Sequence, residues 1–282
     1  MNDDNVEYPT TPNVVHREFT FQEFLDRTIT NGPPAGGVNA TWAGGTFDDA
    51  LNLATNGFAS AIAEAEARIS AIETDIGEGL QSTFHAVHDT AGSEVDISRY
   101  LSGEPECMIE STPIKVMRTG RIIKVAVPVC YSNTIKPETV LNRGAAIMAL
   151  VDAFSRMQHP VEIHAGCAIH NSQYGSKRLV YLVKVQSADQ PLDMSRIMYA
   201  LAHPTMLRQL FFAAEEQEAP DIRRTFDVGI TYGYASYDLR PDDFTDTDVH
   251  NAIILPPLKA NGGWSTSQSA RWIEQELRRL ND

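Results

Sequence analysis

The run RIIKVAVPVC at residues 121–130 constrains the fold more than any other segment. It is nearly continuous in apolar residues, and several of them are β-branched, as is typical of a strand that is buried on both faces. Such a strand requires covering layers on a sheet, which predicts an α/β fold. Pro128 cannot donate a hydrogen bond to a neighbouring strand, so we expect it at the strand end or on a bulge.

The segments after this strand alternate in type. Residues 144–157 carry apolar side chains at helical spacing, and residues 192–217 form a second helical segment that Pro204 divides. Residues 161–170 and 178–187 are separated by a short polar turn, which predicts an antiparallel hairpin. Strands at 226–236 and 251–257 and a final helix that a serine near 265 caps complete the order.

This order predicts a mainly parallel sheet with an antiparallel edge strand and helices on both faces. We place that α/β domain at residues 115–282. Residues 1–114 are interpreted as an N-terminal arm and helical segment with short strands, in which Thr46 caps one helix and Asn56-Gly57 ends it. A helix at 58–76 has one narrow apolar stripe, which fits either packing on its own domain or a contact between subunits.

Composition limits the partners and the compartment. The chain has 282 residues, 43% of them hydrophobic, and a formal net charge of −14. Such a charge repels nucleic-acid phosphates and anionic membranes. Because no stretch approaches 18 consecutive apolar residues and the acidic N-terminus lacks a secretion signal, we expect a cytoplasmic protein without a membrane span. Three cysteines, Cys107, Cys130 and Cys167, fit small buried side chains in a reducing compartment rather than a disulfide framework.

The segment VAVPVCYSNTIKPETVLNRGAAIMALVDAFSRMQHPVEIHAGC resembles the opening of a von Willebrand factor A-like domain, which has a buried strand, a DxSxS-type metal loop, a helix and an edge hairpin. The positions that match D, S and S are Cys130, Ser132 and Thr134. Tyr232 stands where many such domains carry an acid. The resemblance therefore implies a degenerate ion site, because Mg²⁺ prefers carboxylates and disfavours sulfur. We expect no metal and no cofactor there.

Two N-terminal segments, WAGGTFDDALNLATNG and SGEPECM, resemble a phage-associated family of unknown function. This resemblance implies an origin in a phage or another mobile element, and it implies no activity. No phosphate-binding loop and no dinucleotide-binding fingerprint occurs in the sequence.

Three further clusters have chemical alternatives. His164, Cys167 and His170, with Cys130, contain zinc-ligand types, but strand geometry points residue 167 away from the other two. Cys130 with His164 is a candidate Cys/His hydrolase pair. Arg208, in a largely apolar helix, could hold a carboxylate or phosphate or form a structural salt bridge.

The leading hypothesis is a non-catalytic protein-binding module of a phage or mobile element, with its partner at Cys130, Ser132, Thr134 and Tyr232. Crevices form at the carboxyl ends of strands in open α/β sheets, which motivates that location. The first alternative is a nucleic-acid-binding accessory protein, and the second is the Cys/His hydrolase. The candidate nucleic-acid contacts lie in the densest basic stretch: Arg118, Arg121, Lys136 and Arg143.

Overall fold

A computed structural model gives the architecture of the chain. It describes residues 14–62, 66–68, 70, 87–90, 94–95, 97–110, 122–157, 159–171, 177–229, 239–244, 252–258 and 264–281. Within these residues, no helix combines the length and the apolarity that crossing a bilayer requires.

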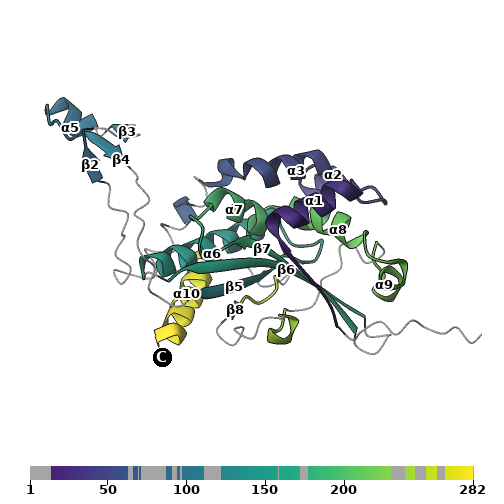
Figure 1. Cartoon of the computed structure of the whole chain (residues 1–282). Helices are drawn as coiled ribbons and strands as arrows, with labels where there is room; N and C mark the ends of the chain where they lie inside the picture. The colour runs from purple at the N-terminus through teal and green to yellow at the C-terminus, as the bar shows by residue number, and fades with distance from the viewer. Residues whose placement is uncertain are drawn as a thin grey trace, which may run out of the picture.

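A five-stranded mixed sheet forms the centre of the molecule (Figure 1). Its order is β1-β7-β6-β5-β8, and three of its four neighbouring pairs are parallel. The strands are β1 (Val14–Thr20), β5 (Ile123–Pro128), β6 (Val161–Asn171), β7 (Lys177–Gln186) and β8 (Ile253–Ile254).

Strand β5 is the apolar run that the sequence predicted to be buried. Alternate residues point to opposite faces of the sheet, so Val125 and Val127 belong to the main core and Ala126 to a smaller core on the other face. All three are at most 1% exposed. Pro128 is the last residue of the strand and pairs with Gly166, which confirms its predicted place at a strand end.

The antiparallel pair lies inside the sheet rather than at its edge. The predicted hairpin of β6 and β7 is confirmed, with a register irregularity between Ile163 and His164. The predicted edge position is wrong because β1 pairs in parallel with β7 along its whole length, from Val14 opposite Arg178 to Thr20 opposite Lys184. The N-terminal arm is therefore an outer strand of the main sheet, and the edges are β1 and β8. The predicted domain boundary at residues 114 and 115 stays a prediction.

The helices share one core with one face of the sheet, as Figure 1 shows for α1, α7 and α8. In the described part of the chain, no buried helical side chain belongs to the smaller core, which corrects the prediction of helices on both faces. Loop residues Leu239 and Phe244 cover that second face instead. The helical elements are α1 (Phe21–Asn31), α2 (Ala40–Ala43), α3 (Phe47–Asn56), η1 (Ala59–Ala61), α6 (Pro137–Arg156), α7 (Met194–Ala202), the π-helical turn η2 (Met206–Phe211), α8 (Phe212–Glu215), α9 (Pro220–Thr225), η3 (Pro241–Asp243) and α10 (Thr266–Asn281).

A second, three-stranded sheet has the order β2-β4-β3 and is antiparallel throughout. Its strands are β2 (Val87–Asp89), β3 (Glu94–Val95) and β4 (Met108–Glu110), and the short helix α5 (Ile97–Leu101) connects β3 to β4. The predicted helix at 58–76 lies largely outside the described residues, and so does most of the strand predicted at 226–236.

Local signals fix the ends of the N-terminal helices. The Thr46 hydroxyl accepts from the backbone of Asp49, whose carboxylate accepts from the backbone of Thr46, so α3 begins with the predicted cap. Gly57 follows α3 with a φ of 79°, and its N–H donates to the Leu53 carbonyl. Glycine reaches this left-handed region without strain, which explains the predicted stop.

A glycine also sets the distance between α6 and α7. A Cβ added at Gly144 would lie 2.7 Å from the Cβ of Ala202, closer than side-chain carbons approach in proteins. The two helices therefore pack closely at this point, next in sequence to the buried Arg143.

One buried carboxylate connects β1, α1, β7 and the segment after α8. Arg17 donates to Glu218 through Nε at 2.9 Å and Nη2 at 2.7 Å, and Arg27 Nη2 donates at 3.0 Å. The Tyr181 hydroxyl donates to the same carboxylate at 2.5 Å. Burial raises the pKa of Glu218, but the hydrogen bonds from Arg17 and Tyr181 outweigh that effect and hold it below its ordinary value.

We expect Glu218→Gln to lower the free energy of unfolding by about 2–3 kcal/mol, because it leaves two guanidinium groups without their shared counter-charge. The partial exposure of Arg17 and Arg27 reduces the loss relative to a fully buried pair. Urea denaturation at pH 7 measures the change. The matched control is Asp26→Asn on the exposed side of α1, which should shift stability by less than about 0.5 kcal/mol. Equal effects of the two variants would contradict the anchoring role of Glu218.

Candidate functional site at the carboxyl end of β5

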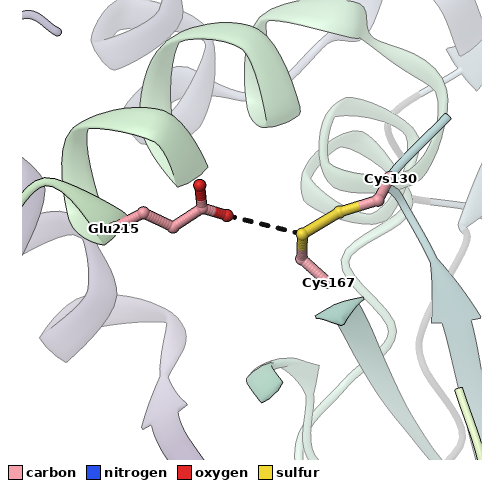
Figure 2. The surroundings of a disulfide bond; sticks show 3 residues. All are labelled: Cys130, Cys167 and Glu215. Carbon is pink, nitrogen blue, oxygen red and sulfur yellow. Dashed lines mark hydrogen bonds between the residues drawn. A yellow bond between two sulfur atoms is a disulfide. The ribbon is translucent and has the colours of Figure 1, made fainter. Parts of the chain in front are cut away.

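The site begins where β5 stops pairing with β6. The Val129 N–H donates to the Gly166 carbonyl at 2.8 Å, and Cys130 then forms a disulfide with Cys167 of β6. Figure 2 shows the two sulfurs bonded between these strands. The sequence interpretation of three reduced, buried cysteines is therefore wrong in part: Cys130 and Cys167 are buried but bonded to each other, and Cys107 is free but only partly buried.

A buried carboxyl group faces the disulfide. Glu215 ends α8, is 2% exposed, and places Oε1 3.4 Å from Cys167 Sγ, on the side away from Cys130 (Figure 2). Burial, with a smaller contribution from the charges of Glu216 and Glu218, raises the pKa of Glu215 to about 8. The carboxyl group is therefore mostly protonated at pH 7 and can donate a proton.

Three more buried polar side chains are grouped around Tyr131, the residue that follows Cys130. Tyr131 is 3% exposed, Arg143 of α6 is 0% exposed, and Arg208 of η2 is 4% exposed. The guanidinium carbon of Arg208 is 4.4 Å from the ring centroid of Trp42 and 5.5 Å from that of Tyr131. We call Tyr131, Arg143 and Arg208 the arginine cluster.

The arginine cluster has unused hydrogen-bond donors. Arg208 Nη1 donates to the Trp42 carbonyl, but its Nε and Nη2 have no hydrogen-bond partner. All three guanidinium nitrogens of Arg143 and the Tyr131 hydroxyl also lack one. No acidic residue in the described ranges forms an ion pair with either arginine. Buried donors are nearly always paired in proteins, so this density of unpaired donors marks a place for an acceptor.

The pKa shifts in the arginine cluster also indicate a place for an anionic acceptor. Burial lowers the pKa of Arg143 to about 10 and also lowers the pKa of Arg208. Burial raises the pKa of Tyr131 to about 12, and the two nearby guanidinium charges oppose that shift. At pH 7 both arginines therefore stay charged and the tyrosine stays neutral, which leaves two positive charges in a desolvated environment.

The structure brings three of the four predicted binding residues together. Ser132 and Thr134 follow Cys130 in a turn before α6, where their hydroxyl oxygens are 3.0 Å apart and the Thr134 N–H donates to Ser132 Oγ at 3.3 Å. Thr134 is exposed and Ser132 is partly exposed. Tyr232 lies outside the described residues.

The predicted basic contacts separate into different environments. Arg118 and Arg121 lie outside the described residues, Lys136 is exposed before α6, and Arg143 is buried within that helix. The prediction of an exposed basic stretch therefore does not hold for Arg143, which is fully buried in α6.

His164 and Cys130, which the Cys/His and zinc hypotheses both use, have other partners in the structure. His164 Nε2 lies 2.8 Å from Glu162 Oε1, and Lys184 Nζ lies 3.0 Å from Glu162 Oε2. Cys130 Sγ is bonded to Cys167 and carries no thiolate in this state. Among the residues with described positions, no group of three or more His, Cys, Asp or Glu side chains is placed to hold a metal ion.

Sequence reasoning missed Glu215 and the burial of Arg143. Glu215 opens the acidic run EEQE at the end of a helical segment, which is typical of an exposed end. Arg143 follows the segment PETVLN, whose proline and polar residues led to its interpretation as part of a loop. The one available signal was Arg208, a charged residue among the apolar residues of MLRQLFF.

Fold and site together define an α/β protein with a mixed sheet and a buried cationic cluster at a strand end. The chain belongs to the family described as Domain of unknown function (DUF7192), which matches residues 12–281. No curated protein and no solved structure matches the chain.

We expect Glu215 to make stability fall as pH rises between about 4.5, its ordinary pKa, and about 8, its pKa in the folded chain. The unfolded chain releases this proton at lower pH than the folded chain, so each pH unit in that window costs at most about 1.4 kcal/mol. Glu215→Gln keeps the shape and has no proton to lose, so its stability should decline less over the window. Urea denaturation from pH 5 to pH 9 measures both slopes. The exposed-site control Glu138→Gln should keep the original slope, and identical slopes for all three proteins would contradict the assignment.

Proposed function

We propose that this protein is a binding module that recognises a carboxylate of a protein partner through the arginine cluster, without a bridging metal ion. The observation that carries the proposal is the pair of buried guanidinium groups, Arg143 and Arg208, in which all three nitrogens of Arg143 and two of the three nitrogens of Arg208 have no hydrogen-bond partner. The exposed turn at Ser132 and Thr134 gives the partner a place to approach.

The energetics favour an oxyanion as the missing partner. An uncompensated charge in the interior is destabilised by several kcal/mol relative to water, and an oxyanion with hydrogen bonds offsets that cost. A guanidinium group presents a planar fork of donors that matches the two oxygens of a carboxylate. The Tyr131 hydroxyl supplies another donor at the same place, and it is neutral at pH 7.

Position in the fold supports a binding role at this point. Ligands of open α/β sheets bind beyond the carboxyl ends of strands, and the arginine cluster adjoins the end of β5. Because all three members are nearly inaccessible, binding requires the exposed turn that follows Tyr131 to move aside. The proposed likeness to a von Willebrand factor A-like loop fits this location, with arginines serving where an ion would bridge two carboxylates. The proposed phage or mobile-element origin does not affect this chemistry.

A protein carboxylate is favoured over nucleic acid for an electrostatic reason. The net charge of −14 opposes the approach of a polyphosphate chain. Of the four basic residues predicted to contact nucleic acid, Lys136 is the one that the structure describes as exposed. A single carboxylate reaches a recessed cationic site with less long-range repulsion than a polyanion does.

The first test uses Arg143→Met and Arg208→Met without any ligand. If the arginines await an external anion, replacing either with an apolar side chain of similar length should leave the free energy of unfolding unchanged or increase it. A loss of about 3–5 kcal/mol in urea denaturation would show instead that a carboxylate elsewhere in this chain already pairs with them. That result would overturn the proposal.

The second test measures binding directly. We expect a hexapeptide that carries a single glutamate and an amidated C-terminus, titrated by calorimetry at constant ionic strength, to bind the unmodified protein and to lose at least about tenfold in affinity with Arg208→Met. The matched control is Arg223→Met at an exposed position of α9. Addition of Mg²⁺ or of a chelator should change nothing. Tighter binding of single-stranded DNA than of the peptide, lost in Arg208→Met, would replace the proposal with the nucleic-acid alternative.

A further inference from the structure

We propose that Cys130 and Cys167 are a redox-active pair and that Glu215 donates a proton to Cys167 when the disulfide is reduced. This inference does not depend on the function proposed for the arginine cluster. It assigns a chemical step to a buried acid and a disulfide that the binding role does not use.

The geometry gives the disulfide two unequal sulfurs. Glu215 Oε1 lies 3.4 Å from Cys167 Sγ, and Figure 2 shows the carboxyl group on the Cys167 side with Cys130 beyond it. Cys130 leads directly into the turn whose residues Asn133 and Thr134 are exposed. Both sulfurs are buried, so a reductant reaches Cys130 first by displacing that turn, whereas Cys167 lies within β6.

A dithiol reductant supplies the two electrons that reduce the disulfide. A thiolate of the reductant attacks Cys130 Sγ and forms a mixed disulfide. The bond between Cys130 and Cys167 breaks, and its electron pair goes to Cys167 Sγ, which takes the proton of Glu215. The second thiol of the reductant then loses its proton to solvent, and its thiolate attacks the reductant sulfur of the mixed disulfide; the products are an oxidised cyclic reductant and a Cys130 thiolate. Solvent supplies one proton to that thiolate and one to the Glu215 carboxylate.

The surroundings of Glu215 suit a proton donor. The ionisable groups that act on it are Glu216 and Glu218, which are next to it along the chain, and Tyr181 of β7. Glu218 is held by two arginines, so its negative charge persists and disfavours a second anion at Glu215. Together with burial, this raises the pKa of Glu215 to about 8, so the acid form is present near neutral pH. Glu215 therefore carries the proton that its transfer to the neighbouring Cys167 sulfur requires.

The role of such a donor is to stabilise the departing sulfur. A thiolate is a better leaving group when its charge is neutralised as it forms, and a positioned acid contributes about 10²–10⁴-fold in proton-transfer steps. Disulfides in reducing compartments are usually transient and redox-sensing, which fits the cytoplasmic location predicted from the sequence.

The experiment follows reduction of the folded full-length chain by dithiothreitol in the absence of oxygen, from pH 6 to pH 9. Cys107→Ser is the background, so that the two new thiols report the pair alone after alkylation and mass measurement. Rates are divided by the thiolate fraction of the reductant at each pH. Circular dichroism confirms that each variant remains folded during the reaction.

We expect Glu215→Gln to slow the corrected rate by at least about tenfold below pH 8, and the difference from the unmodified protein to shrink above pH 8 as Glu215 loses its proton. Glu138→Gln, at an exposed position on α6, should match the unmodified protein at every pH. Equal rates for Glu215→Gln and the unmodified protein across the range would overturn the role of Glu215. A disulfide that resists reduction until the chain unfolds would overturn the redox-active pair.

Discussion

The carboxylate of Glu218 is the interaction on which the arrangement of the sheet and its helical layer depends. It receives hydrogen bonds from Arg17 of β1, Arg27 of α1 and Tyr181 of β7, and it lies just after α8. The contiguous elements β1 and α1 therefore meet β7 and the segment after α8, which lie far from them in the sequence, at one carboxylate. The negative charge of Glu218 also acts on Glu215, because a fixed negative charge nearby makes ionisation of a second carboxyl group unfavourable.

Near the carboxyl end of β5, buried charged groups are paired less completely than is usual in proteins. An acid that stays protonated lies beside Cys167, and two cations without described counter-charges lie near Tyr131, the residue after Cys130. A structure gains nothing in stability from unpaired buried charges, so their presence indicates a requirement other than folding. Binding of an anion and proton delivery to sulfur are two such requirements, and they use different residues.

The sequence predicted the elements better than their assembly. The apolar run of β5, the hairpin of β6 and β7, and the cap at Thr46 follow from period, turn chemistry and hydrogen-bonding side chains, which are local properties. Strand β1 was missed because VVHREFT mixes charged and apolar residues and runs directly into α1. The arginine cluster was missed because the burial of Arg143 is set by tertiary packing, which the pattern of residues along the chain does not reveal.

The pairing of β1 with β7 has a consequence for how the chain is synthesised. Residues 14–20 emerge from the ribosome well before their partners at residues 178–184. At translation rates of about 5–20 residues per second, the arm waits roughly ten seconds or longer before β7 is synthesised. During that interval the β1 segment of the nascent chain has no partner strand. Its pairing with β7 is then a slow, non-local step that completes the sheet. Chaperone protection of this early stretch would therefore matter more to the yield of native molecules than it does for sheets assembled from neighbouring segments.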